Sequence, residues 1–267
     1  MKKITYLTLT LNLLLFMPQC NNLSAAGLSN KGLPIKEVTG KLTSTTANSS
    51  VNLNHDAWTA LLKKHVDHQG NVDYKGFKKD QEKLKEYLNY LSKNKPNDGW
   101  SVQELLAYYI NVYNAFTVEL IVENYPLSSI KDIRGPWKQK FILIGDETFS
   151  LGDVEHKILR KMNEPRIHFA INCASQSCPK LLNEAYVAAK IDQQLNAAAK
   201  KFILSSENKL SEKQLQLSKI FDWFGKDFIS DSTPTVASFI NKYTEIHIQP
   251  NAKVTYFDYN WSLNEKK

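Results

Sequence analysis

The sequence predicts a single α+β domain in which a central buried helix packs on a small mixed or antiparallel sheet. Residues 105–123 are apolar on nearly all sides, as expected for a helix that other elements enclose. Helical and strand-like segments are interspersed without regular alternation, which disfavours a doubly wound parallel sheet. The 267 residues, 42% of them hydrophobic and 11% aromatic, are sufficient to build one sizeable core.

The first 26 residues have the features of a secretory signal peptide. Two lysines precede a leucine-rich apolar run over residues 4–16, which is too short to span a bilayer, and small residues follow at 24–26. Cys20 offers a lipid anchor as the alternative, although the residues before it are larger than such a cleavage site prefers. We therefore expect an exported chain, whether periplasmic, secreted or lipid-anchored, with no transmembrane helix in its mature part.

Residues 27–50 are rich in Gly, Thr, Ser and Asn and show little apolar periodicity. This composition predicts a flexible leader. The folded domain is then expected to cover residues 51–267.

The elements of the domain follow from hydrophobic periodicity, capping residues and turn residues. Helices are predicted over residues 56–68, 79–93, 105–123, a segment after residue 150, and 185–204. A hairpin is predicted over residues 141–149, a buried strand over 167–173, and shorter strand-like pieces within 215–223 and 246–259. The pairs Ser101 with Glu104 and Ser150 with Asp153 have the spacing of capping boxes and mark two helix starts.

Charge and motif content exclude several classes of function. The net charge is +7, but the lysines are scattered or alternate with acids, so we expect no nucleic-acid partner. No glycine-rich phosphate loop is present, and no histidine or cysteine pair has the usual spacing of metal ligands. The sequence therefore predicts neither a cofactor nor a metal.

The densest set of reactive side chains lies in residues 166–179. If this segment is a strand, alternation places Cys173 on its more apolar face, which predicts a core residue. Cys178 precedes a proline that favours the first position of a helix, so we expect its thiol at a helix N-terminus with a lowered pKa. His168 is the nearest base in sequence. The alternatives are a Cys173–Cys178 disulfide, or a buried thiol beside a hydrogen-bonded histidine.

Two further pairs are candidates for the same site. Glu155 and His156 are neighbours on a predicted helix and point about 100° apart, so we do not expect both to face one ligand squarely. Glu155 has the chemistry to orient a histidine, and a surface pair is the alternative. Asn111 and Asn114 share a face of the apolar helix, where their amides must be paired with a loop backbone or with a developing oxyanion.

Four blocks of the sequence occur in the order of a known family. They are A-Y-Y-I-N-V-Y-N-A-F at residues 107–116, S-L-G-D-V-E-H-K-I-L-R at 150–160, R-I-H-F-A-I-N-C-A-S-Q-S-C-P at 166–179, and D-Y-N-W-S-L-N at 258–264. Together they resemble the signature of the domain of unknown function 547 family over roughly residues 55–264. Tyr109 stands where the family pattern has Trp, and Ser177 stands where Gly is usual, but neither change removes a reactive group.

The resemblance implies an exported bacterial member of this family and carries no established activity. The polar positions of the family signature coincide with the candidates above, together with Arg160. The order of a helix followed by a histidine-bearing strand is also similar to the layout of papain-like and transglutaminase-like thiol enzymes, by analogy of layout only.

The leading hypothesis is a thiol-dependent enzyme that transfers an acyl group or hydrolyses an amide of an unknown small-molecule or peptide substrate. Cys178 is then the nucleophile, His168 the base and Glu155 the group that orients it, with Asn111 or Asn114 at the oxyanion. One alternative is a non-catalytic envelope protein that binds a ligand or has a structural role. Another is a redox protein that cycles a Cys173–Cys178 bridge.

Overall fold

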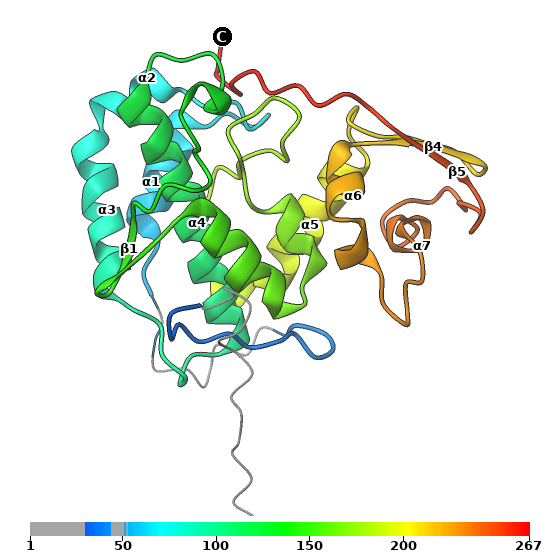
Figure 1. The fold of residues 1–267 in the computed structure, drawn as a ribbon, viewed down its shortest axis with the longest axis horizontal. Coiled ribbons are helices and arrows are strands. Elements are labelled where there is room, and N and C mark those ends of the chain that lie inside the picture. Colours follow the sequence, from blue (N-terminus) through cyan, green and yellow to red (C-terminus); the bar gives the residue numbers. More distant parts are fainter. Residues whose placement is uncertain (1–29, 44–50, 52) are drawn as a thin grey trace, which may run out of the picture.

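A computed structural model of the protein describes residues 30–43, 51 and 53–267 (Figure 1). The predicted signal peptide, including Cys20, lies outside the described residues. Helices predominate, and the strands form a two-stranded hairpin and a separate three-stranded sheet. The predicted α+β class and the central buried helix are confirmed.

The central helix is α4, Val102–Asn124, and it lies in the middle of the helical part of the molecule (Figure 1). The capping box between Ser101 and Glu104 starts it as predicted, and nearly every side chain along it is buried. Its length and apolar composition would suit a membrane span, contrary to the expectation that no later segment is long enough. The most apolar part of α4 is nevertheless wholly enclosed by protein.

Three amphipathic helices pack beside α4. They are α1 (Asp56–His65), α2 (Tyr74–Lys79) and α3 (Gln81–Lys93). The predicted inward stripe of α3 is buried as expected, and the main neighbours of α4 are α3 and α2. Asp80 separates α2 from α3, so the single helix predicted from residue 79 begins two residues later.

The predicted hairpin is present as β1 (Ile142–Ile144) and β2 (Glu147–Phe149), in antiparallel register. The capping box between Ser150 and Asp153 also forms and starts a helical segment. That segment is not an ordinary α-helix. It continues as a π-helix, η3 (Asp153–Ile158), and a 3-10 turn, η4 (Leu159–Met162). Single π-helical turns such as η3 are frequent at functional sites.

The strand predicted over residues 167–173 is wrong. Residues Pro165–Phe169 form the 3-10 helix η5, which begins at a proline and is capped by the Glu164 side chain. Ile167, His168 and Phe169 are all buried, so faces do not alternate as in a half-buried strand. The predicted helix start at Cys178 is also wrong, because the next helical residues are 188–190.

The second half of the chain builds a smaller apolar cluster around Phe169, Phe221 and Phe228. Its helical elements are η6 (Ala188–Lys190), α5 (Ile191–Ile203), α6 (Lys219–Trp223), η7 (Gly225–Phe228) and α7 (Val236–Ile240). Its strands are β3 (Lys209–Leu210), β4 (Gln214–Leu217) and β5 (Lys253–Tyr256). Strand β4 pairs antiparallel with β3 and parallel with β5. Residues 219–223, predicted as part of a strand-like piece, are thus helical.

Residues 30–43 are packed on the domain, so the prediction that residues 27–50 form a flexible leader is wrong for this part. Leu33 and Leu42 are buried in the main core. The Tyr109 hydroxyl donates to the Pro34 carbonyl at 2.9 Å, and the Val38 amide donates to the Met162 carbonyl at 2.8 Å. Isolated leucines without helical or strand periodicity gave no signal of this packing. The domain therefore begins before residue 51.

After β5 the chain runs back across the molecule to end near α2 (Figure 1). The amide of Val72 donates to the Asn264 carbonyl, and the amide of Lys266 donates to the Val72 carbonyl, both at 2.9 Å. Leu263 pairs with Ser175 in an isolated antiparallel bridge. The terminal segment thus crosses the cysteine-bearing loop.

Candidate functional site

The loop of residues 170–178 carries both cysteines and is held from two sides. From α4, the Asn114 amide donates to the Ala170 carbonyl at 3.0 Å and accepts from the Asn172 amide at 2.8 Å. From the terminal segment, the Ser262 carbonyl accepts from the Gln176 amide at 2.8 Å. These bonds fix the loop between two elements that are far apart in sequence.

Inside the loop, the Asn172 side chain makes two further contacts. Its side chain donates to the Pro179 carbonyl at 2.8 Å and accepts from the Ala174 amide at 2.9 Å. Ala174 has a φ of 60°, a left-handed conformation that a non-glycine residue adopts only when its surroundings fix it. The turn at Ala174 directs the chain back so that the two cysteines meet.

The two cysteine sulfurs lie 3.0 Å apart, and both are free thiols. The Cys173 amide also donates to the Cys178 sulfur at 2.9 Å. Their exposure is the reverse of the expectation, because Cys178 is 4% exposed while Cys173 is only half-buried. The strand that would have turned Cys173 into the core does not form, which explains the difference.

The surroundings shift the pKa values of the two thiols in opposite directions. The hydrogen bond with Cys178 lowers the pKa of Cys173 below its ordinary value and outweighs burial. The hydroxyls of Tyr259 and Ser175, at 3.2 and 3.3 Å from the Cys173 sulfur, add to this effect. Burial raises the pKa of Cys178 well above the ordinary value. Cys173 is therefore the thiol that ionises, and the Cys178 S–H then donates to it.

A cavity of about 200 Å³ opens beside these sulfurs, and both cysteines line it. Glu155, His156 and His168 line the same cavity, so the neighbouring Glu155 and His156 do both face it. The expectation that they could not rested on ordinary α-helical geometry, whereas this segment is the π-helix η3. The predicted residues Cys178, His168, Glu155 and His156 are thus brought together at one cavity.

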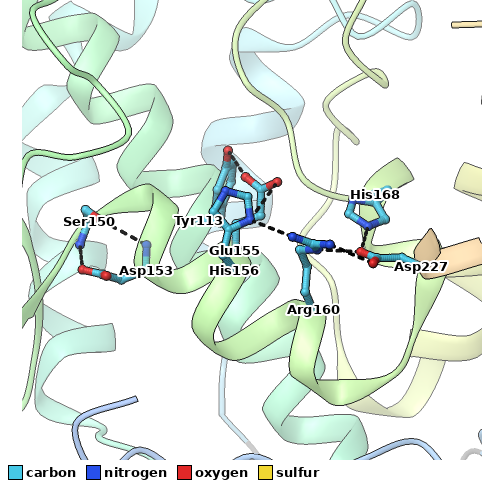
Figure 2. Close-up of polar contacts among 8 residues, drawn as sticks. All are labelled: Tyr113, Ser150, Asp153, Glu155, His156, Arg160, His168 and Asp227. Carbon is cyan, nitrogen blue, oxygen red and sulfur yellow. Dashed lines mark hydrogen bonds and ion pairs between the residues drawn. The ribbon is translucent and has the colours of Figure 1, made fainter. Parts of the chain in front are cut away.

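A chain of polar contacts connects the ionisable groups behind the cavity (Figure 2). The Tyr113 hydroxyl donates to Glu155 Oε2 at 3.3 Å, and Glu155 Oε1 lies 3.9 Å from Nδ1 of His156. Arg160 NH1 lies 3.4 Å from the same His156 nitrogen. Burial raises the pKa of Glu155 to about 7, and the nearby Cys173 adds to the rise. This carboxyl therefore changes protonation in the neutral range.

The predicted base His168 is paired with Asp227, not with a sulfur. Nε2 of His168 lies 2.8 Å from Asp227 Oδ2, while Arg160 binds Asp227 in a bidentate contact at 2.6 and 2.8 Å. Burial lowers the pKa of His168 although Asp227 opposes the shift. The neutral ring then donates from Nε2, and Nδ1 is the acceptor. Asp227, rather than Glu155, holds this histidine.

The two predicted asparagines have backbone partners. Asn111 donates to the Tyr186 carbonyl at 2.7 Å and accepts from the Tyr186 amide at 3.0 Å, just as Asn114 binds the residues before Cys173. Neither asparagine is among the residues that line the cavity. Both amides therefore act as internal ties, which was the alternative to an oxyanion role.

Aromatic side chains form a further part of the cavity wall. Tyr259 and Trp261 have ring centroids 4.6 Å apart, and Trp223 stacks near both, at 4.9 and 5.8 Å. Trp137 meets Trp261 edge to face at 5.7 Å. These rings give the cavity a largely apolar wall next to the Cys173 thiol.

A protein-family model matches part of this chain. The model of a family described as "Protein of unknown function, DUF547" matches residues 97–203, which contain α4, the hairpin, η3, the cysteine loop and α5. This segment of the chain belongs to the DUF547 family. No curated protein and no solved structure matches the chain. The expected family resemblance is thereby confirmed over residues 97–203, which contain three of the four sequence blocks.

Several site residues lie outside the matched segment and were not predicted. Asp227 follows a tryptophan-phenylalanine-glycine stretch that carries no catalytic signal. Tyr259 and Trp261 do stand in the terminal block of the family resemblance, so that block was a usable signal. Among the described residues, no group of three or more His, Cys, Asp or Glu is arranged to hold a metal ion.

Proposed function

We propose that this protein is a thiol-dependent enzyme that carries out thiol–disulfide exchange, with Cys173 as the attacking thiol and Cys178 as the second thiol. One observation carries the proposal. Two free sulfurs lie 3.0 Å apart at one cavity; the pKa of the more exposed Cys173 is lowered, and burial raises the pKa of Cys178. An accessible thiolate with a buried partner thiol is the arrangement that this exchange needs.

The reaction is balanced without any further oxidant or reductant. The Cys173 thiolate attacks one sulfur of a substrate disulfide, forms a mixed disulfide and releases the first substrate thiolate, which takes a proton from water. Cys178 then loses its proton and attacks the Cys173 sulfur, which forms the Cys173–Cys178 bridge and releases the second substrate thiolate. The second substrate thiolate takes up the proton that Cys178 has lost. Counted from the dithiol, whose Cys173 proton passes to solvent on ionisation, the protein loses two electrons and two protons, and the substrate disulfide becomes two thiols.

Glu155 is the group that takes up the proton from Cys178 in this proposal. It lines the same cavity, and its pKa of about 7 gives it a substantial basic fraction at neutral pH. The pKa of Cys178 is raised by burial, so its ionisation requires such a base. His168 and Asp227 instead fix η7 and η5 at the wall of the cavity.

Acyl transfer is the second candidate, because Cys173, His168 and Glu155 line one cavity. It requires donors for an oxyanion. The amides of Asn111 and Asn114 are bound to backbone, and the loop N–H groups of residues 173, 174, 176, 177 and 178 already have acceptors. Exchange between sulfurs needs no oxyanion site, so the geometry favours it.

Single-cysteine variants test the assignment. In a Cys20→Ser background, Cys178→Ser should accumulate a stable mixed disulfide with a small disulfide at Cys173, detected by mass spectrometry of the intact protein. The parent should instead pass to the internal bridge, and Cys173→Ser should not react with the disulfide. A Cys173–Cys178 bridge that resists millimolar dithiothreitol in the folded protein would instead support the non-catalytic protein with a structural disulfide.

We also propose that the protein acts outside the cytoplasm, on the basis of the signal-like composition of residues 1–26. In an oxidising compartment the reverse direction is favoured, and the bridged protein oxidises substrate thiols. The mass of the N-terminal peptide of protein from a native host tests export. An uncleaved, unlipidated N-terminus in the cytosolic fraction contradicts it.

A further inference from the structure

The aromatic wall of the cavity offers ring faces next to the reactive thiol. Trp223 is 47% exposed, and it stacks on Trp261 with an interplanar angle of 28°. Tyr259 joins both rings and also contacts the Cys173 sulfur through its hydroxyl. A group bound to this wall therefore lies close to the attacking sulfur.

The charges that face the cavity are negative. Among the described residues that line it, none is a lysine or an arginine, although the whole chain has a net charge of +7. Its acidic groups are the Glu155 carboxyl and the Cys173 thiol. The two lining histidines, His156 and His168, are pushed towards their neutral forms by burial. Arg160, behind the cavity, is neutralised by its bidentate contact with Asp227.

This combination disfavours an anionic ligand and favours a cationic one. Carboxylate, phosphate or sulfonate groups would meet the Glu155 carboxylate without a compensating cation among the lining residues. A cation is attracted both by that carboxylate and by the faces of the aromatic rings. Two aromatic rings that line the cavity already have cations over them: Lys131 Nζ lies 5.2 Å from the Trp261 centroid, and Arg160 Cζ lies 5.3 Å from that of Phe224.

We propose that the cavity binds the ammonium group of a small cationic disulfide or thiol, held between Glu155 and the wall formed by Trp223, Tyr259 and Trp261. This inference rests on the proposed thiol–disulfide exchange and names its substrate class. A cavity of about 200 Å³ is below the roughly 300–1,000 Å³ of pockets for drug-sized ligands, so the bound part is a small head group.

Three disulfides of similar size and different charge test the substrate class. They are cystamine, which carries two ammonium groups, the neutral bis(2-hydroxyethyl) disulfide, and the dianionic dithiodiglycolate. The rate of mixed-disulfide formation at Cys173 is measured by mass spectrometry in the Cys20→Ser, Cys178→Ser background. Each rate is divided by that of a neutral reference thiol, N-acetylcysteine amide, to remove intrinsic differences in reactivity. We expect cystamine to exceed dithiodiglycolate by about tenfold or more after this correction.

Two charge-matched variants locate the origin of the preference. Glu155→Gln should reduce the ratio between cystamine and dithiodiglycolate several-fold, while Glu86→Gln, which removes an exposed carboxylate on α3, should leave it unchanged. If Glu155→Gln fails to fold, unreactive tetramethylammonium replaces the variant test. It should slow alkylation of Cys173 by iodoacetamide in the otherwise native protein more than sodium chloride does at equal ionic strength.

The outcomes separate the two proposals. Equal corrected rates for the three disulfides, or absence of tetramethylammonium protection, overturn the cationic substrate class and leave thiol–disulfide exchange standing. If Cys173 reacts with none of the three disulfides, the proposed function itself fails.

Discussion

Glu155 is buried and Asp227 half-buried in one contact network, and their surroundings shift their pKa values in opposite directions (Figure 2). Glu155 has a hydroxyl partner and no close cation, so burial raises its pKa to about 7. Burial also acts on Asp227, but hydrogen bonds from Arg160 and His168 outweigh it and hold its pKa below the ordinary value. The cavity therefore contains one carboxyl that titrates near neutrality, while the other remains charged and structural.

The Glu155→Gln substitution should make stability less dependent on pH. The folded-state pKa is raised above the unfolded value of 4.5, so the native state prefers the neutral acid. Below pH 4.5 the neutral Glu155 does not destabilise the folded state. The destabilisation grows as the pH rises to about 7 and reaches roughly 3 kcal/mol at higher pH. A neutral amide avoids this destabilisation. Urea unfolding at pH 5 and pH 8 should show a higher free energy of unfolding for the variant than for the parent only at pH 8.

Glu86→Gln is the control for that measurement, because Glu86 is exposed on α3. It should shift stability by less than about 0.5 kcal/mol at either pH. A Glu155→Gln variant that is less stable than the parent at pH 8 would show that its carboxylate is stabilised in the folded protein, contrary to the burial argument.

Removing the Asp227 carboxylate should destabilise the protein, in contrast to Glu155. Asp227→Asn leaves the Arg160 guanidinium and the buried His168 without their common acceptor. Because its folded-state pKa is depressed, Asp227 contributes stability above its unfolded pKa, and this contribution is lost as pH falls through the folded value. We expect a loss of about 2 kcal/mol at pH 7 by urea unfolding. The exposed pair of Lys219 with Asp222 is the matched control, and Asp222→Asn should cost less than about 1 kcal/mol.

At the scale of elements, α4 fixes two loops through equivalent amides three residues apart. Asn114 holds the loop that carries Cys173, and Asn111 holds the backbone of Tyr186 before α5. Each amide makes one donor and one acceptor contact with buried backbone. The two positions therefore separate a general loss of stability from a specific loss of thiol geometry.

Asn114→Ala and Asn111→Ala should both destabilise the protein by about 2–4 kcal/mol, because each leaves a buried N–H and a buried C=O without a partner. Only Asn114→Ala should also slow alkylation of Cys173 by iodoacetamide at pH 7, since it releases the loop that places Cys178 against that sulfur. Rates are compared in a Cys20→Ser background under conditions where both variants are folded. Equal slowing in both variants would contradict a specific role for Asn114.

The elements with strong local signals could be predicted from the sequence. The capping box at Ser101 and the apolar composition of residues 105–123 gave α4, and the turn residues after Ile144 gave the hairpin. Residues 167–173 were misassigned because a short apolar run has the same composition in a strand and in a buried 3-10 turn. Residues 155, 156, 168 and 178 were all candidates and do line one cavity, but the predicted burial of the two cysteines depended on that one element and is reversed in the structure.

At the scale of the whole molecule, the site depends on contacts between distant parts of the chain. Asp227 comes from η7 in the second apolar cluster, Glu155 comes from η3 beside α4, and Tyr259 comes from the terminal segment. No local pattern encodes such pairings, which explains why Asp227 and Tyr259 were not identified from the sequence. The terminal segment connects these parts, because it contacts both the cysteine loop and the helical part of the molecule.

Asn264 joins these parts through its side chain. Its amide donates to Asn172 Oδ1 at 3.3 Å, and its carbonyl oxygen accepts from the Tyr74 hydroxyl at 2.7 Å. Asn264→Ala should therefore release the terminal segment from the cysteine loop and lower stability by about 2–3 kcal/mol. Hydrogen–deuterium exchange of the amides of Gln176 and Ser177, which donate to this segment, should accelerate about tenfold or more.

The control for this release is Ser262→Ala, because Ser262 holds the loop through its backbone carbonyl while its side chain is exposed. It should leave the exchange of Gln176 unchanged. Amides within α3 should keep their parent rates in both variants, since α3 packs on α4 away from the terminal segment. If α3 in Asn264→Ala exchanges faster by the same factor as the cysteine loop, the variant has only lowered global stability. Separate acceleration of the loop would show that the end of the chain closes the thiol site independently of the helical core.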